Sequence, residues 1–103
     1  ILIDDSIVRG NTSKNIIKLL KDSGINKIIF CSAAPKIYNK NQYGIYIEEK
    51  EELITFKNKT NEEIAKAIGA DKIYYNSLQD VVSVVNYLNP EIKSMELSMF
   101  IDN

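Results

Sequence analysis

The sequence has little cysteine, proline or glycine and no long apolar run, and these absences exclude several classes of protein. Cys31 is the one cysteine among 103 residues, so no internal disulfide can form and a disulfide-stabilised secreted scaffold is excluded. The apolar neighbours of Cys31 predict a small buried side chain in a core strand. No apolar run reaches the ~20 residues of a membrane helix, and no signal peptide is recognisable. We therefore expect a cytoplasmic protein with no membrane partner.

A large charge of one sign is also missing. Thirteen lysine and arginine residues balance fourteen aspartate and glutamate residues, for a net charge of −1. Because nucleic-acid-binding proteins neutralise phosphates with a basic surface, we expect no nucleic-acid partner. Apolar residues make up 45% and charged residues 26% of the chain. This balance is typical of a folded globular domain and excludes long disorder and collagen-like sequence.

Apolar runs alternate with helical periodicities along the chain, which favours an α/β architecture. The expected strands are 1–3, 27–33, 72–75 and 95–100. The expected helices run from 11 to a stop at 23–24, over 48–56, from 60 to 69 and from 77 to 88. A chain of 103 residues is too short for a complete doubly wound sheet. Since it opens within an apolar run, we expect a domain truncated at its N-terminus.

Capping residues mark the starts of three expected helices. Thr60 and Glu63 have the spacing of a capping box, in which each residue binds the backbone N–H of the other. Ser77 can cap the last helix. For the first helix, Asn11, Thr12 and Ser13 are all candidate N-caps.

Two adjacent carboxylates, Asp4 and Asp5, follow the first strand and precede a loop that leads into a helix. Ligands of open α/β sheets bind at this end of the strands. The loop Ser6–Gly10 and the helix start Asn11–Thr12 offer unpaired N–H groups, hydroxyls and the positive end of a helix, which suit a phosphate group. The carboxylates suit sugar hydroxyls or hydrated magnesium. These residue types therefore point to a sugar phosphate.

The segment Asp4–Thr12 resembles the phosphoribosyl pyrophosphate motif of type I phosphoribosyltransferases. Its Ser-Ile-Val-Arg-Gly portion is similar to the form found in glutamine phosphoribosylpyrophosphate amidotransferases, also called amidophosphoribosyltransferases. The resemblance covers nearly the whole chain. Further matches lie at 32–35, 43–45, 52–54, 68–71 and 89–92. Asn11 stands where the family usually has threonine, and Tyr46 where it usually has aspartate.

The resemblance implies that residues 1–103 are the C-terminal portion of a phosphoribosyltransferase domain. The implied fold is a partial type I phosphoribosyltransferase fold, with a parallel sheet flanked by helices. The glutaminase domain and the first half of the transferase domain would be absent. The family enzyme makes 5-phosphoribosylamine, glutamate and pyrophosphate from phosphoribosyl pyrophosphate, glutamine and water, which is the first step of de novo purine (IMP) biosynthesis.

The resemblance also implies roles for the site residues. Asp4 and Asp5 would bind the ribose hydroxyls and Mg²⁺, and Ser6–Thr12 would hold the 5-phosphate, with no nucleophile among them. The implied substrate-binding residues are Asp4, Asp5, Ser6, Ile7, Val8, Arg9, Gly10, Asn11 and Thr12. The chain has no ligand set for an iron–sulfur cluster, so we expect none. Purine nucleotides are implied ligands, and we expect the full-length protein to be a homo-oligomer.

Four other interpretations compete with this one. Acidic pairs also end strands, and Ser, Thr and Asn also cap helices, without any ligand. The residue types alone do not decide between this structural role and a binding site. The opening segment resembles a response-regulator receiver, but 39–56 lacks the aspartate that such a domain phosphorylates. Another type I phosphoribosyltransferase would share the acidic pair, typically with a Thr- and Gly-rich loop in place of Ile7–Arg9. An inactive remnant would keep the motif without the activity.

Overall fold

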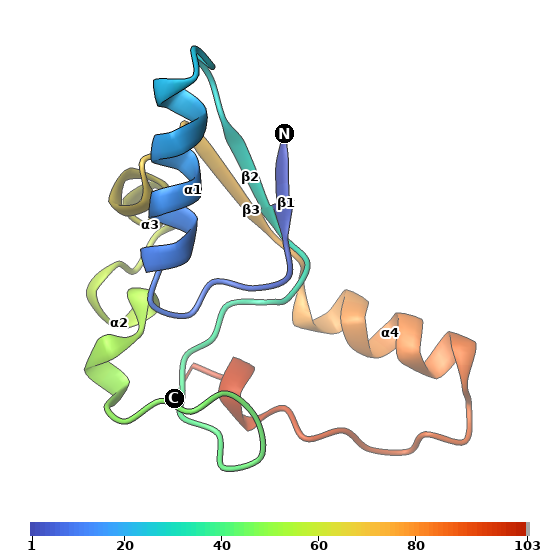
Figure 1. Ribbon diagram of the computed structural model, residues 1–103. Helices are drawn as coiled ribbons and strands as arrows, with labels where there is room; N and C mark the ends of the chain where they lie inside the picture. The colour runs from blue at the N-terminus through green and yellow to red at the C-terminus, as the bar shows by residue number, and fades with distance from the viewer. Residues whose placement is uncertain (103) are drawn as a thin grey trace.

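Three short strands form one parallel sheet in the order β1–β2–β3 (Figure 1). The computed structural model describes residues 1–102, and its strands are β1 (Leu2–Asp4), β2 (Ile29–Ser32) and β3 (Lys72–Tyr75). The Cα pairs Leu2–Phe30 and Phe30–Ile73 fix the register. Because the strands are parallel, their carboxyl ends meet at one edge of the sheet. The predicted α/β class with a parallel sheet is confirmed.

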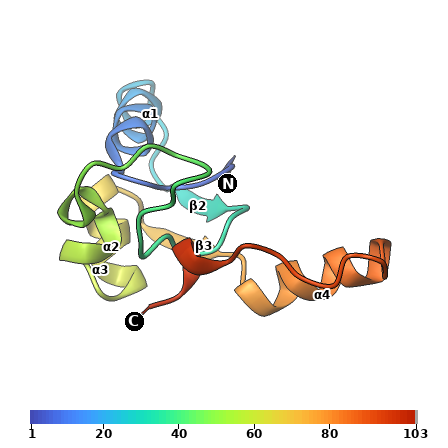
Figure 2. The same ribbon diagram turned by 90° about the horizontal axis from the view of Figure 1, so that it is seen from below.

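Two helices cover one face of this sheet. α1 (Asn11–Asp22) connects β1 to β2 and lies beside α3 (Asn61–Ile68), which precedes β3 (Figures 1 and 2). Ile17 of α1 and Ile64 of α3 pack with Phe30 of β2 in a cluster whose side chains are almost fully buried. Burying each such side chain contributes about 1.5–3 kcal/mol, so this cluster fixes α1 against the sheet.

The opposite face of the sheet is largely open among the described residues. Ile3, Cys31 and Tyr74 are neighbours across the three strands and alternate with the core residues. Ile3 is 72% exposed and Tyr74 is 51% exposed. Cys31 lies in β2 as expected, but it is partly exposed rather than buried. The prediction of burial was wrong because it assumed a sheet covered on both faces, as parallel sheets usually are.

The α4 helix (Leu78–Leu88) projects away from the sheet (Figures 1 and 2). The predicted cap is confirmed, since the Ser77 hydroxyl accepts the Asp80 N–H at 3.0 Å. The apolar stripe of α4 is not buried, and Leu88 is 74% exposed. The radius of gyration is 14.8 Å, compared with roughly 13 Å for a compact domain of this length. Within residues 1–102, no helix is long and apolar enough to cross a membrane.

The expected single helix over 48–56 is instead two short helical segments. η1 (Lys50–Glu52) is a 3₁₀ helix and α2 (Ile54–Lys57) is an α-helix. Leu53 separates them with extended backbone angles, φ −67° and ψ 135°. Its side chain is fully buried in a second apolar cluster with Ile37 and Ile47. Burial of Leu53 therefore breaks the helix that the local sequence favours.

The expected strand over 95–100 is wrong. This segment contains the 3₁₀ helix η2 (Ser98–Phe100) and pairs with no strand of the described sheet. The Met99 carbonyl accepts the N–H groups of Tyr38 and Asn39 at 2.7 and 3.2 Å. Met99 and Phe100 also pack against the second apolar cluster. Docking onto the loop after β2 thus replaces strand pairing.

Candidate phosphate-binding site

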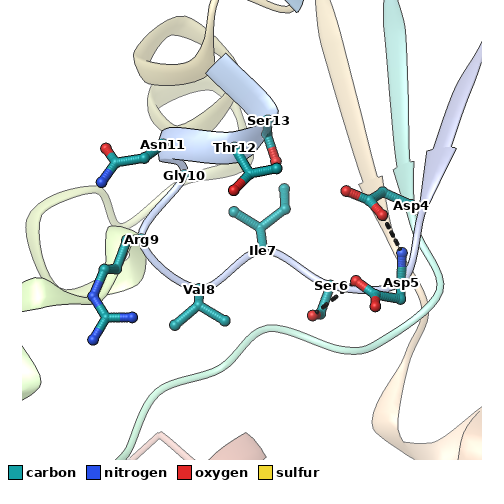
Figure 3. Close-up of a pocket in the computed structure, with 10 residues that line it drawn as sticks. All are labelled: Asp4, Asp5, Ser6, Ile7, Val8, Arg9, Gly10, Asn11, Thr12 and Ser13. Carbon is teal, nitrogen blue, oxygen red and sulfur yellow. Dashed lines mark hydrogen bonds between the residues drawn. The ribbon is translucent and has the colours of Figure 1, made fainter. Parts of the chain in front are cut away.

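A cavity of about 490 Å³ lies between the carboxyl end of β1 and the start of α1 (Figure 3). Its lining is one continuous stretch of chain. The lining residues are Asp4, Asp5, Ser6, Ile7, Val8, Arg9, Gly10, Asn11, Thr12 and Ser13. The structure thus brings all nine residues of the sequence prediction to one cavity. It adds Ser13, which the sequence suggested only as a helix cap.

The backbone of this stretch is rich in free hydrogen-bond donors. Within residues 1–102, no N–H group from Ser6 to Ser13 has a hydrogen-bond acceptor. The run is bounded by the Asp5 N–H, which donates to Asp4 Oδ1, and the Lys14 N–H, which donates to the Gly10 carbonyl. The first N–H groups of a helix also carry a partial positive charge. An anion is therefore the ligand that this backbone suits best.

Gly10 is the N-cap of α1, and no side chain of the described residues caps the start of this helix. The expectation that Asn11, Thr12 or Ser13 would be the N-cap was wrong, because the helix already begins at Asn11. Gly10 adopts φ 87° and ψ −4°, a left-handed conformation that other residues adopt only with strain. Since no side chain occupies the first-turn N–H groups, they stay available to a ligand.

The two carboxylates lie together at the end of β1 (Figure 3). Asp4 Oδ1 accepts the Asp5 N–H at 2.9 Å, and Asp5 Oδ1 accepts the Ser6 hydroxyl at 3.2 Å. Among the described residues, no group of three or more His, Cys, Asp or Glu side chains is placed to hold a metal ion. A donor set of two carboxylates fits magnesium, which takes one or two carboxylates together with water and phosphate oxygens.

The remaining side chains of the stretch differ in where they point. Ile7 is buried in the main core, so only its backbone is available to a ligand. Val8 packs against the second apolar cluster. Thr12 and Ser13 lie below the helix start, toward Ile7, whereas Asn11 is exposed and points away from them (Figure 3). The Asn11 side chain therefore points to the other side from Thr12, although Asn11 is one of the residues that line the cavity.

Arg9 contributes its backbone to the cavity while its side chain extends away (Figure 3). Its Nε donates to Glu52 Oε2 at 2.5 Å, and its Nη2 donates to the Tyr46 carbonyl at 3.3 Å. Hydrogen bonds from the Glu49 N–H and from Arg9 lower the pKa of Glu52 below its usual value. Sequence reasoning missed Glu52 as a site residue, and its one signal was its place in the matching stretch 52–54.

Fold and site together define a parallel α/β protein whose loop between its first strand and helix has the backbone geometry that suits an anion. The chain is 40% identical over 103 residues to an amidophosphoribosyltransferase of Lachancea kluyveri, which covers 100% of the chain. It is 43% and 41% identical over 100 residues to those of Pasteurella multocida and Escherichia coli, each covering 97% of it. No family model matches. The chain belongs to the amidophosphoribosyltransferase family and spans 20% of the length of each of these relatives.

Proposed function

We propose that this chain is the C-terminal portion of the phosphoribosyltransferase domain of an amidophosphoribosyltransferase, and that its cavity binds phosphoribosyl pyrophosphate. The observation that carries the proposal is the run of free N–H groups from Ser6 to Ser13 beside the carboxylates of Asp4 and Asp5. A ribose 5-phosphate needs donors for its phosphate and acceptors for its hydroxyls. The N–H groups of Ser6–Ser13 supply the donors, and the neighbouring carboxylates of Asp4 and Asp5 supply the acceptors.

In the proposed complex, the N–H groups from Ser6 to Ser13 hold the 5-phosphate and the carboxylates accept hydrogen bonds from the ribose hydroxyls. The reaction displaces pyrophosphate from the anomeric carbon by ammonia, and positive charge develops on the ribose ring. The carboxylates of Asp4 and Asp5 stabilise that charge, because fixed charges act strongly where they face the developing one. These residues bind and stabilise, and none of them acts as a nucleophile.

Asp4 and Asp5 would also hold Mg²⁺, which when bound stabilises the negative charge of the pyrophosphate leaving group. The ammonia would come from glutamine in a part of the enzyme outside residues 1–103. The complete reaction would then yield 5-phosphoribosylamine, glutamate and pyrophosphate, the opening step of purine synthesis. We further propose a cytoplasmic location and a homo-oligomeric complete enzyme that also binds purine nucleotides.

Calorimetric titration of the complete polypeptide with phosphoribosyl pyrophosphate and Mg²⁺ tests the site. Asp5→Asn keeps the size of the side chain but removes its charge, so we expect affinity to fall roughly tenfold or more, the value of one charge-assisted hydrogen bond. Asp22→Asn is the matched control, because Asp22 lies at the far end of α1 and, among residues 1–102, its side chain pairs only with Lys18. Equal affinities of the wild type and Asp5→Asn would refute the assignment.

A further inference from the structure

The loop Ser6–Gly10 is hydrogen-bonded to residues 46–54, which lie more than thirty positions further along the chain. Arg9 Nε donates to Glu52 Oε2 at 2.5 Å, and Arg9 Nη2 donates to the Tyr46 carbonyl at 3.3 Å. The Ile54 N–H donates to the Val8 carbonyl at 2.9 Å. These bonds join the middle of the loop to residues 46–54. The N–H groups of the loop itself have no acceptor within residues 1–102, so these contacts set its conformation.

Glu52 is itself held in place. Its Oε1 accepts the Glu49 N–H at 2.9 Å, so the carboxylate uses one oxygen to cap η1 and the other to bind Arg9. The side chains of Arg9 and Glu52 are 36% and 31% exposed. The pair is therefore screened less than a fully exposed ion pair. A carboxylate fixed in this way also loses little further side-chain entropy when it binds the guanidinium.

We propose that Glu52 is a positioning residue for phosphoribosyl pyrophosphate: by binding Arg9 outside the cavity, it holds the Ser6–Gly10 loop in the conformation that leaves its N–H groups free for the 5-phosphate. This inference rests on the function proposed above. Because Glu52 neutralises Arg9, the phosphate is recognised by backbone N–H groups rather than by the arginine. When the pair is broken, a smaller fraction of the molecules has the binding-competent loop conformation. The apparent affinity falls in proportion to that fraction.

A direct role for Arg9 predicts a different set of results. If Arg9 bound the phosphate, Arg9→Gln would weaken binding, whereas Glu52→Gln would release the guanidinium and leave affinity unchanged or improved. If Glu52 positions the loop through Arg9, both substitutions weaken binding by the same factor. The double variant is then no weaker than either single variant, because two residues that act through one contact are not additive.

The experiment is calorimetric titration of the complete polypeptide with phosphoribosyl pyrophosphate and Mg²⁺. We expect Glu52→Gln, Arg9→Gln and the double variant each to weaken binding about fivefold, the upper range for a partly exposed ion pair. Glutamine keeps a carbonyl oxygen for the Glu49 N–H, so the cap of η1 is preserved. The matched control is Glu51→Gln, which removes a charge from the exposed neighbouring residue and should leave affinity unchanged.

Steady-state kinetics separates positioning from a general loss of structure. A loop that holds the 5-phosphate contributes equally to ground-state and transition-state binding, so KM for phosphoribosyl pyrophosphate should rise about fivefold with kcat unchanged. Unchanged or tighter binding by Glu52→Gln, or additive losses in the double variant, would overturn the inference. If Glu52→Gln does not fold, Arg9→Lys decides. Lysine keeps the charge but replaces the two nitrogen atoms that reach Glu52 and the Tyr46 carbonyl by a single ammonium group, so unchanged affinity would overturn the positioning role.

The same titrations distinguish failure of this inference from failure of the proposed function. If the wild type binds and Asp5→Asn weakens binding while Glu52→Gln does not, the positioning role alone is refuted. If the wild type does not bind phosphoribosyl pyrophosphate at all, both proposals fail together.

Discussion

Replacing Gly10 by alanine tests the backbone geometry on which the candidate site depends. Gly10 has φ 87°, and a Cβ atom there would lie 2.7 Å from Ile54 Cδ1 and 3.3 Å from Ile68 Cγ2. The left-handed conformation costs an alanine about 1–2 kcal/mol. Overpacking costs about 1–3 kcal/mol, and we take the lower end because Ile54 Cδ1 is the flexible tip of its side chain. The expected loss is therefore about 2–3 kcal/mol in the free energy of unfolding.

Urea denaturation followed by circular dichroism measures this loss, since the chain contains no tryptophan. Two other glycines provide matched controls. Gly24 has φ 102°, and no other atom of residues 1–102 lies within 4 Å of the position that a Cβ atom would take, so Gly24→Ala should lose only the backbone contribution of about 1–2 kcal/mol. Gly44 has no left-handed φ and its nearest contact is Asn41 Oδ1 at 3.4 Å, so Gly44→Ala should change stability by less than about 0.5 kcal/mol.

Comparing the three glycine variants separates the cost of the left-handed backbone from the cost of packing a Cβ atom against Ile54. Equal losses for Gly10→Ala and Gly24→Ala would show that Ile54 moves aside without cost. A loss for Gly10→Ala as small as that of Gly44→Ala would refute the left-handed N-cap, and with it the geometry that leaves the first-turn N–H groups of α1 free.

Further predictions concern the core and a helix cap. Phe30→Ala should lower the free energy of unfolding by about 3–5 kcal/mol because Phe30 is fully buried. Phe56 is 40% exposed, so Phe56→Ala should lower it by less than about 1 kcal/mol. Similar losses for the two variants would contradict the described core. Hydrogen bonds from the N–H groups of Thr60 and Lys59 lower the pKa of Glu63, so its stabilising effect is present above the unfolded pKa of about 4.3 and is lost as pH falls through the lower folded pKa. Denaturation should therefore find Glu63→Gln less stable than the wild type at neutral pH but not at about pH 3, and a difference independent of pH would contradict this.

The sequence by itself determined the parts of this protein that depend on neighbouring residues. The lining of the candidate cavity is one continuous stretch, and the order strand, acidic pair, loop and helix predicted nine of its ten residues, Asp4–Thr12, but not Ser13. That these residues bind a ligand stays a prediction. The capping box of Thr60 and Glu63 was predicted for the same reason, and the structure confirms both of its hydrogen bonds. Alternation of apolar runs and helical periodicities likewise predicted the α/β class, and the family resemblance implied the parallel sheet; the structure confirms both.

Only the tertiary structure decided features that depend on distant contacts. Leu53 breaks the helix expected over 48–56 because burial outweighs local helix propensity, and the segment 95–100 docks on the loop after β2 instead of pairing as a strand. The bond between Arg9 and Glu52 joins residues 43 positions apart, which no local pattern specifies. Local hydrogen bonds and periodicity fix where elements form, whereas burial and long-range pairing decide which local preference is kept and where each side chain points.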